Sequence, residues 1–553
     1  MPLRVYFLIF KPRCNLLSIL LSVLQEIAVV FPERQTLTEL WLKATERYGK
    51  KVCFQTYRDG GVYDRLTYGD FGVRVRSFAS LLRMLGVKKG DRVMILAENR
   101  PQWPIAYFGT ALAGAITVPV LTDFTAEQIG AIASHAEISV LCCTGRTSNK
   151  IAGIDPSIPV LHIDLEPEKQ IPNGNTEFPA ETWPGINEDD PASIIYTSGT
   201  TGNSKGVLLS HRNLVFNAVS TRSLMKLYSR DRLLSVIPLA HTYECVLGML
   251  TAVMSGASVT YLDKPPSPAV LLPAMQILRP TAMVTVPLFI EKICRNKIFP
   301  KLKKSPFYRF PLTRSLAVWA AGQKLMTALG ASIRIFGIGG APLSEDVERF
   351  LRKAGFPYTL GYGLTETAPL VTGTSPHKFH FRCSGSALKG VELRIAEAGE
   401  IQVRGPNVMM GYYRDEKRTR DTFTEDGWLK TGDLGRLDQK GQLFINGRLK
   451  ALILGPSGEN IYPEEIESML NTSGLVEDAL VVPGERGELV ALIVLSEKAQ
   501  TMIAALGENL EELKNSVNKK LAAFSRLSRI EIRKEPFEKT PTMKIKRFLY
   551  CKP

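Results

Sequence analysis

Cysteine and histidine are scarce in this sequence, which has 8 cysteines and 6 histidines among 553 residues. The cysteines form no CxxC pair, and the histidines do not stand at metal-ligand spacing from them. This excludes a disulfide-rich secreted scaffold and predicts a cytoplasmic protein with free thiols. A Walker-type phosphate loop is also missing, because Ser204 stands where its second glycine would fall. Pro342 likewise replaces the third glycine of a dinucleotide fingerprint.

Apolar runs of the ~20 residues needed to span a bilayer are absent as well. The N-terminal extension, residues 1–35, comes nearest, but residues 11–13 and the pair Gln25-Glu26 interrupt its two apolar runs. In the second run, residues 15–31, polar residues recur at steps of three and four, which places them on one helical face. This pattern favours a helix packed on the body, or a start site set too early. An interfacial membrane helix is the alternative.

Short apolar runs and helical patterns alternate beyond residue 36. We expect buried strands at residues 92–96, 116–120 and 140–143, and a helix at residues 104–115. Such alternation indicates an α/β fold with parallel sheets. The chain length suggests roughly three or four domains or subdomains.

The charge is strongly positive, at +15. Anions are therefore plausible partners: ATP, a phosphorylated thiol carrier, an anionic membrane surface or nucleic acid. No basic and aromatic motif typical of nucleic-acid binding is present, so we expect no nucleic-acid partner. Basic residues concentrate in residues 292–314 and face almost no acid there. That stretch is either an ordinary solvated surface or an attraction site for anionic lipid or carrier.

Residues 196–206 form a loop rich in glycine and hydroxyl side chains after an expected strand at residues 193–195. Glycines let backbone N–H groups approach phosphate oxygens, hydroxyls add donors, and a lysine adds positive charge. The candidate phosphate-binding residues are Thr197, Ser198, Gly199, Thr200, Thr201, Gly202 and Lys205.

This loop resembles the signature of the adenylate-forming superfamily of acyl-CoA synthetases, adenylation domains and luciferases. Further motifs match in order: Pro-Leu-Ala-His-Thr-Tyr-Glu at 238–244, Gly-Gly-Ala-Pro at 339–342, Gly-Tyr-Gly-Leu-Thr-Glu at 361–366, Lys-Thr-Gly-Asp at 430–433, Gly-Arg-Leu-Lys at 447–450, Ser-Gly-Glu-Asn-Ile-Tyr-Pro-Glu-Glu at 457–465 and Lys-Thr-Pro-Thr-Met-Lys at 539–544. The resemblance covers residues 36–553 and is strongest to bacterial long-chain fatty acid–CoA ligases.

The resemblance implies a role for each matching residue. Thr197 and Glu366 would hold Mg²⁺, Thr365 would contact the α-phosphate, and His241 would lie where the acyl and nucleotide pockets meet. The adenosine would be bound by Gly339, Gly340, Ala341, Tyr362, Gly363, Asp433 and Arg448. Adenine would stack on the Tyr362 ring, and the ribose hydroxyls would bind Asp433.

Lys544 is the expected catalytic residue, because a flexible ammonium reaches both the acid and the α-phosphate. Met543 stands before it where relatives often have glycine. Lys450 would be the hinge, and Gly458 would line the thiol path. The implied architecture is a large N-terminal domain of layered α/β subdomains, residues 36–448, and a small mobile C-terminal α+β domain, residues 449–553.

The resulting expectation is an AMP-forming ligase that activates a medium- to long-chain fatty acid with ATP and Mg²⁺ as acyl-AMP. The acyl group would then pass to CoA. An acyl carrier protein is the alternative acceptor, and a non-catalytic lipid-binding relative is the alternative from another class. Peripheral attachment to the inner membrane face is a further expectation.

Overall fold

The computed structural model describes residues 33–165, 183–197, 205–376, 380–454, 460–484, 488–500, 506–539 and 545–550. Most of the N-terminal extension and the phosphate-loop residues Ser198, Gly199, Thr200, Thr201 and Gly202 lie outside these ranges. Gly458 and Lys544 also lie outside the described residues.

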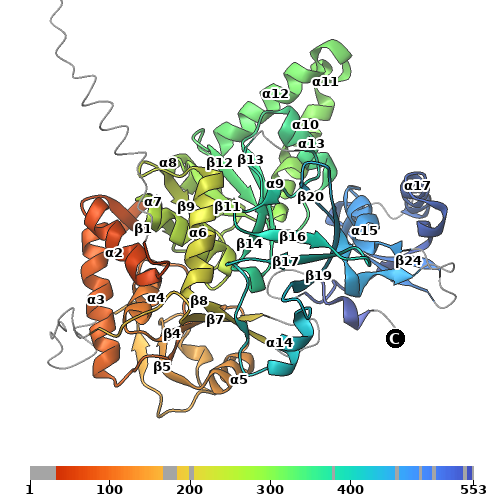
Figure 1. Ribbon diagram of the computed structural model, residues 1–553. Coiled ribbons are helices and arrows are strands. Elements are labelled where there is room, and N and C mark those ends of the chain that lie inside the picture. Colours follow the sequence, from red (N-terminus) through yellow and green to blue (C-terminus); the bar gives the residue numbers. More distant parts are fainter. Residues whose placement is uncertain are drawn as a thin grey trace, which may run out of the picture.

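A seven-stranded sheet forms the first layer (Figure 1). In spatial order its strands are β18 (Gly411–Tyr412), β8 (Lys205–Ser210), β7 (Pro191–Thr197), β4 (Ile116–Pro119), β3 (Arg92–Leu96), β5 (Ile138–Cys143) and β6 (Val160–His162). Strands β4, β3, β5 and β6 are parallel, whereas β7, β8 and β18 pair antiparallel. The expected strands are confirmed, and the expected helix is α4 (Gln102–Leu112).

A nine-stranded sheet forms the second layer. In spatial order its strands are β15 (Ser386–Ala387), β14 (Leu370–Gly373), β13 (Tyr358–Gly363), β12 (Ile335–Ile338), β11 (Ala282–Thr285), β9 (Arg232–Leu234), β10 (Ser258–Leu262), β1 (Val52–Arg58) and β2 (Gly61–Thr67). From β13 to β1 neighbouring strands run parallel. The α/β expectation is therefore confirmed, and most neighbouring strands of both sheets are parallel, with antiparallel strands added at the sheet edges.

Helices α2 (Leu37–Tyr48), α3 (Tyr68–Met84), α4 and α6 (His211–Met225) contribute to the largest core. Helix α4 is apolar on every side and almost completely buried, as expected for a helix without a solvent face. Helix α3 begins with a capping box in which Thr67 and Asp70 satisfy each other's backbone N–H groups. Trp41 and Trp103 are fully buried in this core.

The chain between β11 and β12 forms a projection of helices, visible at the upper right of Figure 1. Its members are α9 (Pro287–Ile293), the π-helix η5 (Cys294–Ile298), α10 (Phe299–Lys304), α11 (Pro306–Arg309) and α12 (Pro311–Ala328). Helix α12 returns along α13 (Glu345–Lys353) before the chain enters the sheet.

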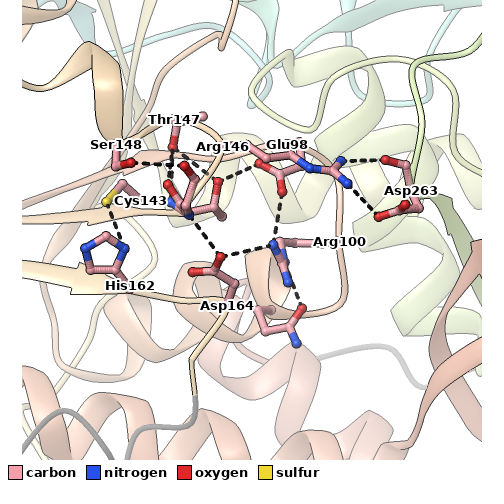
Figure 2. Close-up of polar contacts among 12 residues, drawn as sticks. Glu98, Arg100, Cys143, Arg146, Thr147, Ser148, His162, Asp164 and Asp263 are labelled. Carbon is pink, nitrogen blue, oxygen red and sulfur yellow. Dashed lines mark hydrogen bonds and ion pairs between the residues drawn. The ribbon is translucent and has the colours of Figure 1, made fainter.

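A cluster of polar side chains lies at the carboxyl-terminal ends of strands in the seven-stranded sheet (Figure 2). It lies where the parallel strands β3, β5 and β6 end, because Glu98 and Asp164 follow two of those strands. Arg100 contacts both carboxylates, at 3.0 and 3.9 Å. Arg146 binds Asp263, which follows β10, at 2.9 Å. The cluster therefore links the ends of strands from the two large sheets.

The C-terminal third contains a four-stranded and a three-stranded sheet, in addition to the two-stranded pair β21 (Ile453–Leu454) and β22 (Asn460–Ile461). The first has the order β16 (Glu392–Ile395), β17 (Glu400–Arg404), β19 (Leu429–Leu437) and β20 (Leu443–Arg448). The second comprises β23 (Val476–Pro483), β24 (Leu489–Leu495) and β25 (Leu527–Arg533), accompanied by α15 (Pro463–Asn471) and α17 (Leu506–Asn518). It has its own hydrophobic core, around Ile466, Leu470 and Ile493. The expected architecture, a large N-terminal α/β domain followed by a small C-terminal α+β domain, is confirmed. The boundary at residue 448 stays a prediction.

Candidate active site

Lys205, Glu366 and Tyr412 form a closed triangle of polar contacts. The Lys205 ammonium lies 2.5 Å from Glu366 Oε1 and donates to the Tyr412 hydroxyl at 2.7 Å. The Tyr412 hydroxyl in turn donates to Glu366 Oε1 at 2.9 Å. Lys205 begins β8, Tyr412 ends β18, and Glu366 stands in the 3₁₀ turn η6 (Thr365–Thr367) after β13. The triangle therefore joins the two large sheets.

The electrostatics of this triangle keep Glu366 ionised. Burial alone would raise the pKa of the Glu366 carboxyl, but the Lys205 charge and the hydrogen bonds from Lys205, Tyr412 and the backbone together outweigh burial and lower that pKa below its usual range. Burial likewise opposes the charge on Lys205, yet Glu366 and Tyr412 raise the pKa of the ammonium. The site thus presents a carboxylate and a cation together, close to where the phosphate loop leaves β7.

Thr197 lies directly opposite Lys205 in the β7–β8 pairing. Its hydroxyl is buried and has no hydrogen-bond partner within the described ranges. A buried polar atom without a partner is rare in proteins and often faces a ligand. The hydroxyl and the Glu366 carboxylate are both oxygen ligands of the kind that Mg²⁺ prefers.

The predicted Mg²⁺ site contains few acidic side chains from the protein itself. In the described part of the chain, no three His, Cys, Asp or Glu side chains gather where they could hold a metal. Mg²⁺ commonly binds one or two carboxylates together with substrate phosphates rather than a protein cage. Glu366 and Thr197 fit that mode, in which phosphate oxygens of ATP complete the ligand set.

A second cluster holds Tyr362, Asp433 and Arg448. The Tyr362 hydroxyl donates to Asp433 Oδ2 at 2.8 Å, and Arg448 Nε lies 3.2 Å from Asp433 Oδ1. Asp433 on β19 and Arg448 at the end of β20 are directly paired strand neighbours. Burial and the Asp433 charge raise the pKa of the Tyr362 hydroxyl, so this tyrosine stays a neutral donor. Three of the seven residues predicted to bind adenosine, Tyr362, Asp433 and Arg448, are thus brought together from two sheets.

Glycines allow the backbone conformations found close to the Lys205–Glu366–Tyr412 triangle and the Tyr362–Asp433–Arg448 cluster. Gly339 and Gly340 follow β12, and Gly340 has a φ of +83°, in the left-handed region that favours glycine. Gly340 and Ala341 are exposed at this end of the sheet. At Gly363 a Cβ atom would lie 1.8 Å from the carbonyl oxygen of Pro369, so any side chain there would disrupt the turn that carries Glu366.

A partly open cavity of about 30 Å³ adjoins this end of β12 and β13. Its lining contains no charged side chain and consists of Thr221, Leu224, Met225, Tyr243, Leu247, Val284, Gly337, Ile338, Thr359, Leu360, Gly361, Leu370, Gly373 and Thr374. Half-buried His241 stands two residues before Tyr243, which lines the cavity and begins the π-helix η4 (Tyr243–Leu250).

The remaining predicted residues are placed less centrally. Thr365 is half-buried and adjoins Glu366 in η6, and Lys450 is exposed in the 3₁₀ turn η7 (Leu449–Ala451). Tyr412 was missed by the sequence analysis although it contacts both Lys205 and Glu366. Its only signal in the sequence is the pair Gly411-Tyr412, and in the structure Gly411 has a φ of +147°.

Comparison with known proteins agrees with this geometry. The family described as AMP-binding enzyme matches residues 40–413, and its C-terminal domain family matches residues 451–552. The chain is 32% identical to the long-chain-fatty-acid–CoA ligase FadD15 of Mycobacterium bovis, over 90% of this chain and 92% of that protein. It is 27% identical to 4-coumarate–CoA ligase 1 of Petroselinum crispum, over 94% of each.

Solved structures show the same fold. ATP-bound MatB from Rhodopseudomonas palustris superposes with a TM-score of 0.75 at 26% identity, over 93% of this chain and 98% of that one. Together with the two family matches, which cover most of the chain, this likeness establishes the relationship. The protein belongs to the AMP-binding enzyme family and is an AMP-forming acyl-CoA ligase of the adenylate-forming superfamily.

Proposed function

We propose that this acyl-CoA ligase activates medium- to long-chain fatty acids with ATP and passes the acyl group to CoA. The observation that carries the proposal is the uncharged, largely apolar cavity beside β12 and β13. An amino acid or a dicarboxylic acid would need a charged partner there, whereas an alkyl chain needs apolar surface. The relative FadD15 is named as a long-chain ligase, and the 4-coumarate ligase leaves an aromatic acid as the competing substrate.

The cavity must widen before a long acid can enter. Its volume of about 30 Å³ is close to that of one water molecule, whereas small-molecule pockets usually measure ~300–1,000 Å³. Leu224 and Gly373, both in the cavity lining, lie close together, because a Cβ added at Gly373 would lie 2.6 Å from Leu224 Cδ1. Leu224 is half-buried near the end of α6, and we infer that its side chain rotates to admit the alkyl chain.

The polar clusters supply the nucleotide side of the reaction. Glu366 and Thr197 would hold Mg²⁺, which supplies charge neutralisation at the phosphates when it is bound. Lys205 would place a positive charge beside the phosphate loop, and Asp433 would accept from the ribose hydroxyls. The charge that develops as the carboxylate attacks the α-phosphate has to be met by a further cation. We assign that role to Lys544 from its motif.

ATP–pyrophosphate exchange tests the acid. We expect exchange to increase from butanoic to hexadecanoic acid and to stay low with coumaric acid. A bulky Leu224→Trp variant should lose the long acids first while keeping the exchange with butanoic acid. Ser223→Trp is the matched control, because Ser223 is the exposed neighbour on the same helix. Strong exchange with coumaric acid alone would refute the fatty-acid assignment.

The acceptor is tested separately by thioester formation. Pre-formed acyl-AMP should react with CoA, and acyl carrier protein is the competing thiol. If the acyl group were transferred only to the carrier protein, the carrier and not CoA would be the acceptor. The formation of acyl-AMP would still stand. A protein that bound fatty acid without any exchange would instead be a non-catalytic lipid-binding relative.

A further inference from the structure

The tip of the helical projection exposes large apolar side chains. Phe307 is 63% exposed, Phe310 66%, Leu312 98%, Leu316 62% and Trp319 52%. They come from α11, from the junction that follows it and from the first half of α12, which lie at the end of the projection farthest from the two sheets (Figure 1). Single exposed apolar residues are normal on protein surfaces, but a contiguous group usually marks an interaction site.

These side chains are not an extension of the core. On α12, Val318, Gly322 and Leu325 are buried, and a Cβ added at Gly322 would lie 2.6 Å from the Cβ of Ala354, just beyond α13. Leu312 and Leu316, four residues apart, lie on a different face of the same helix, together with Trp319. Helix α12 therefore has one apolar face that packs on the body and a second that the described chain leaves uncovered.

The segment that carries the uncovered face is rich in cations. No Asp or Glu occurs between Lys292 and Ser344, and the exposed cations near the tip are Lys301, Lys303, Lys304, Arg309 and Arg314. Arg314 stacks on Tyr308 at 4.6 Å and also donates to its hydroxyl. In the ranges that the structure describes, none of the five cations forms an ion pair with an acid. Their charge is thus available to an external anion.

We propose that this tip, residues 301–319, docks the enzyme on an anionic lipid bilayer. Phe307, Phe310 and the apolar side chains of α12 would enter the interface, and the Lys and Arg side chains of the same segment would bind head groups. A bilayer offers apolar depth and surface anions at once, which is the combination that the tip presents. A second copy of the same tip would instead bring like charges together.

The proposed contact is that of a peripheral membrane protein, which rests on the bilayer and does not cross it. Among the helices that the structure describes, none has both the length and the apolar character needed to cross a membrane. The tip would enter only the interfacial layer, so binding should respond to salt as well as to apolar substitutions. The tip lies away from β8 and β19, which carry polar clusters of the active site (Figure 1), and its contact with a bilayer does not depend on the acid that is activated.

Vesicle sedimentation with the full chain tests the surface. We expect binding to vesicles of phosphatidylcholine and phosphatidylglycerol, weak binding to phosphatidylcholine alone, and loss of affinity at high salt. Lys303→Gln with Lys304→Gln should weaken binding about fivefold per charge, and Leu312→Ser with Leu316→Ser roughly tenfold per residue. Val73→Ser, at an exposed valine on α3, is the matched control and should leave binding unchanged.

Trp319 reports the location of the contact. Vesicles with brominated acyl chains should quench part of the tryptophan fluorescence, and the Trp319→Phe variant should bind but lose that quenching. Trp41 and Trp103 are fully buried and should not respond. ATP–pyrophosphate exchange with butanoic acid should be unchanged in every tip variant, which shows that the variants fold and separates this test from the proposed function.

Two results would overturn the proposal. One is vesicle binding that persists in the tip variants and disappears when residues 1–35 are deleted, because it would assign the contact to the N-terminal extension. The other is unquenched Trp319 in the vesicle-bound enzyme, because it would show that the tip faces water or an acidic protein partner.

Discussion

Glu244 gives the sharpest quantitative test of the structure. It lies in η4 with 1% of its surface exposed, and one of its carboxyl oxygens has no partner within the described residues. Burial raises the pKa of the Glu244 carboxyl to about 8, although a hydrogen bond with Ser235 opposes the rise. Glu244 is therefore mostly a neutral acid at pH 7 in the folded enzyme and an ionised one in the unfolded chain.

The sign of the resulting pH dependence follows from proton uptake. Between the unfolded pKa near 4.5 and the folded pKa near 8, the folded state holds a proton that the unfolded state has released. Stability contributed by this group is thus greatest at low pH and falls as pH rises. The loss is about 1.4 kcal/mol per pH unit, or about 2 to 3 kcal/mol between about pH 5 and 7.

The variant Glu244→Gln removes this titration. Urea unfolding at several pH values, followed through the fluorescence of the buried Trp41 and Trp103, measures the free energy of unfolding of both proteins. The variant should gain about 2 to 3 kcal/mol relative to the wild type from about pH 5 to 7. Glu46→Gln, at an exposed glutamate on α2, is the control and should follow the wild type. If Glu244→Gln also ran parallel to the wild type, the buried, neutral acid would be refuted.

The other predictions concern catalysis. Lys544→Ala should abolish acyl-AMP formation while pre-formed acyl-AMP still reacts with CoA, and near-normal adenylation would contradict its role. Glu366→Gln should lower activity and raise the Mg²⁺ concentration required, whereas an unchanged Mg²⁺ titration would count against Glu366 as a ligand. Tyr412→Phe keeps the charged partners of its triangle and should cost roughly fivefold in kcat/KM, the equivalent of about 1 kcal/mol. Asp433→Asn should raise the KM for ATP about tenfold, and an unaltered KM would argue against a ribose contact.

Much of the nucleotide side could be predicted from the sequence because its motifs are local. Thr197, Gly339 and Glu366 stand at or just after the end of a strand, where the fold of the backbone fixes their positions. Asp433 and Arg448 were assigned from the resemblance of their motifs to the family's, and the structure pairs them across adjacent strands. The two mostly parallel sheets also followed from strands and helices that alternate along the chain.

Contacts between segments that are distant in the chain could not be predicted from the sequence. Tyr412 lies 207 residues from Lys205, and no local pattern indicates that their side chains meet. The cavity beside β12 and β13 could not be predicted for the same reason, since its lining comes from α6, η4 and four strands. The exposed apolar face of α12 could not be predicted either, because the sequence of a basic stretch does not show whether the apolar residues within it are buried or exposed.

The triangle of Lys205, Glu366 and Tyr412 has a consequence for how the protein matures. Lys205 and Glu366 are 161 residues apart and belong to different sheets, so their contact forms only after both sheets have folded and docked. Contacts of such long sequence separation form late, because the intervening chain must be ordered first. Nucleotide affinity should therefore appear abruptly during refolding, after most secondary structure is in place. Any ligand that spans the triangle would stabilise the docked sheets by mass action, so ATP should protect the newly made enzyme against proteolysis before it ever meets an acid.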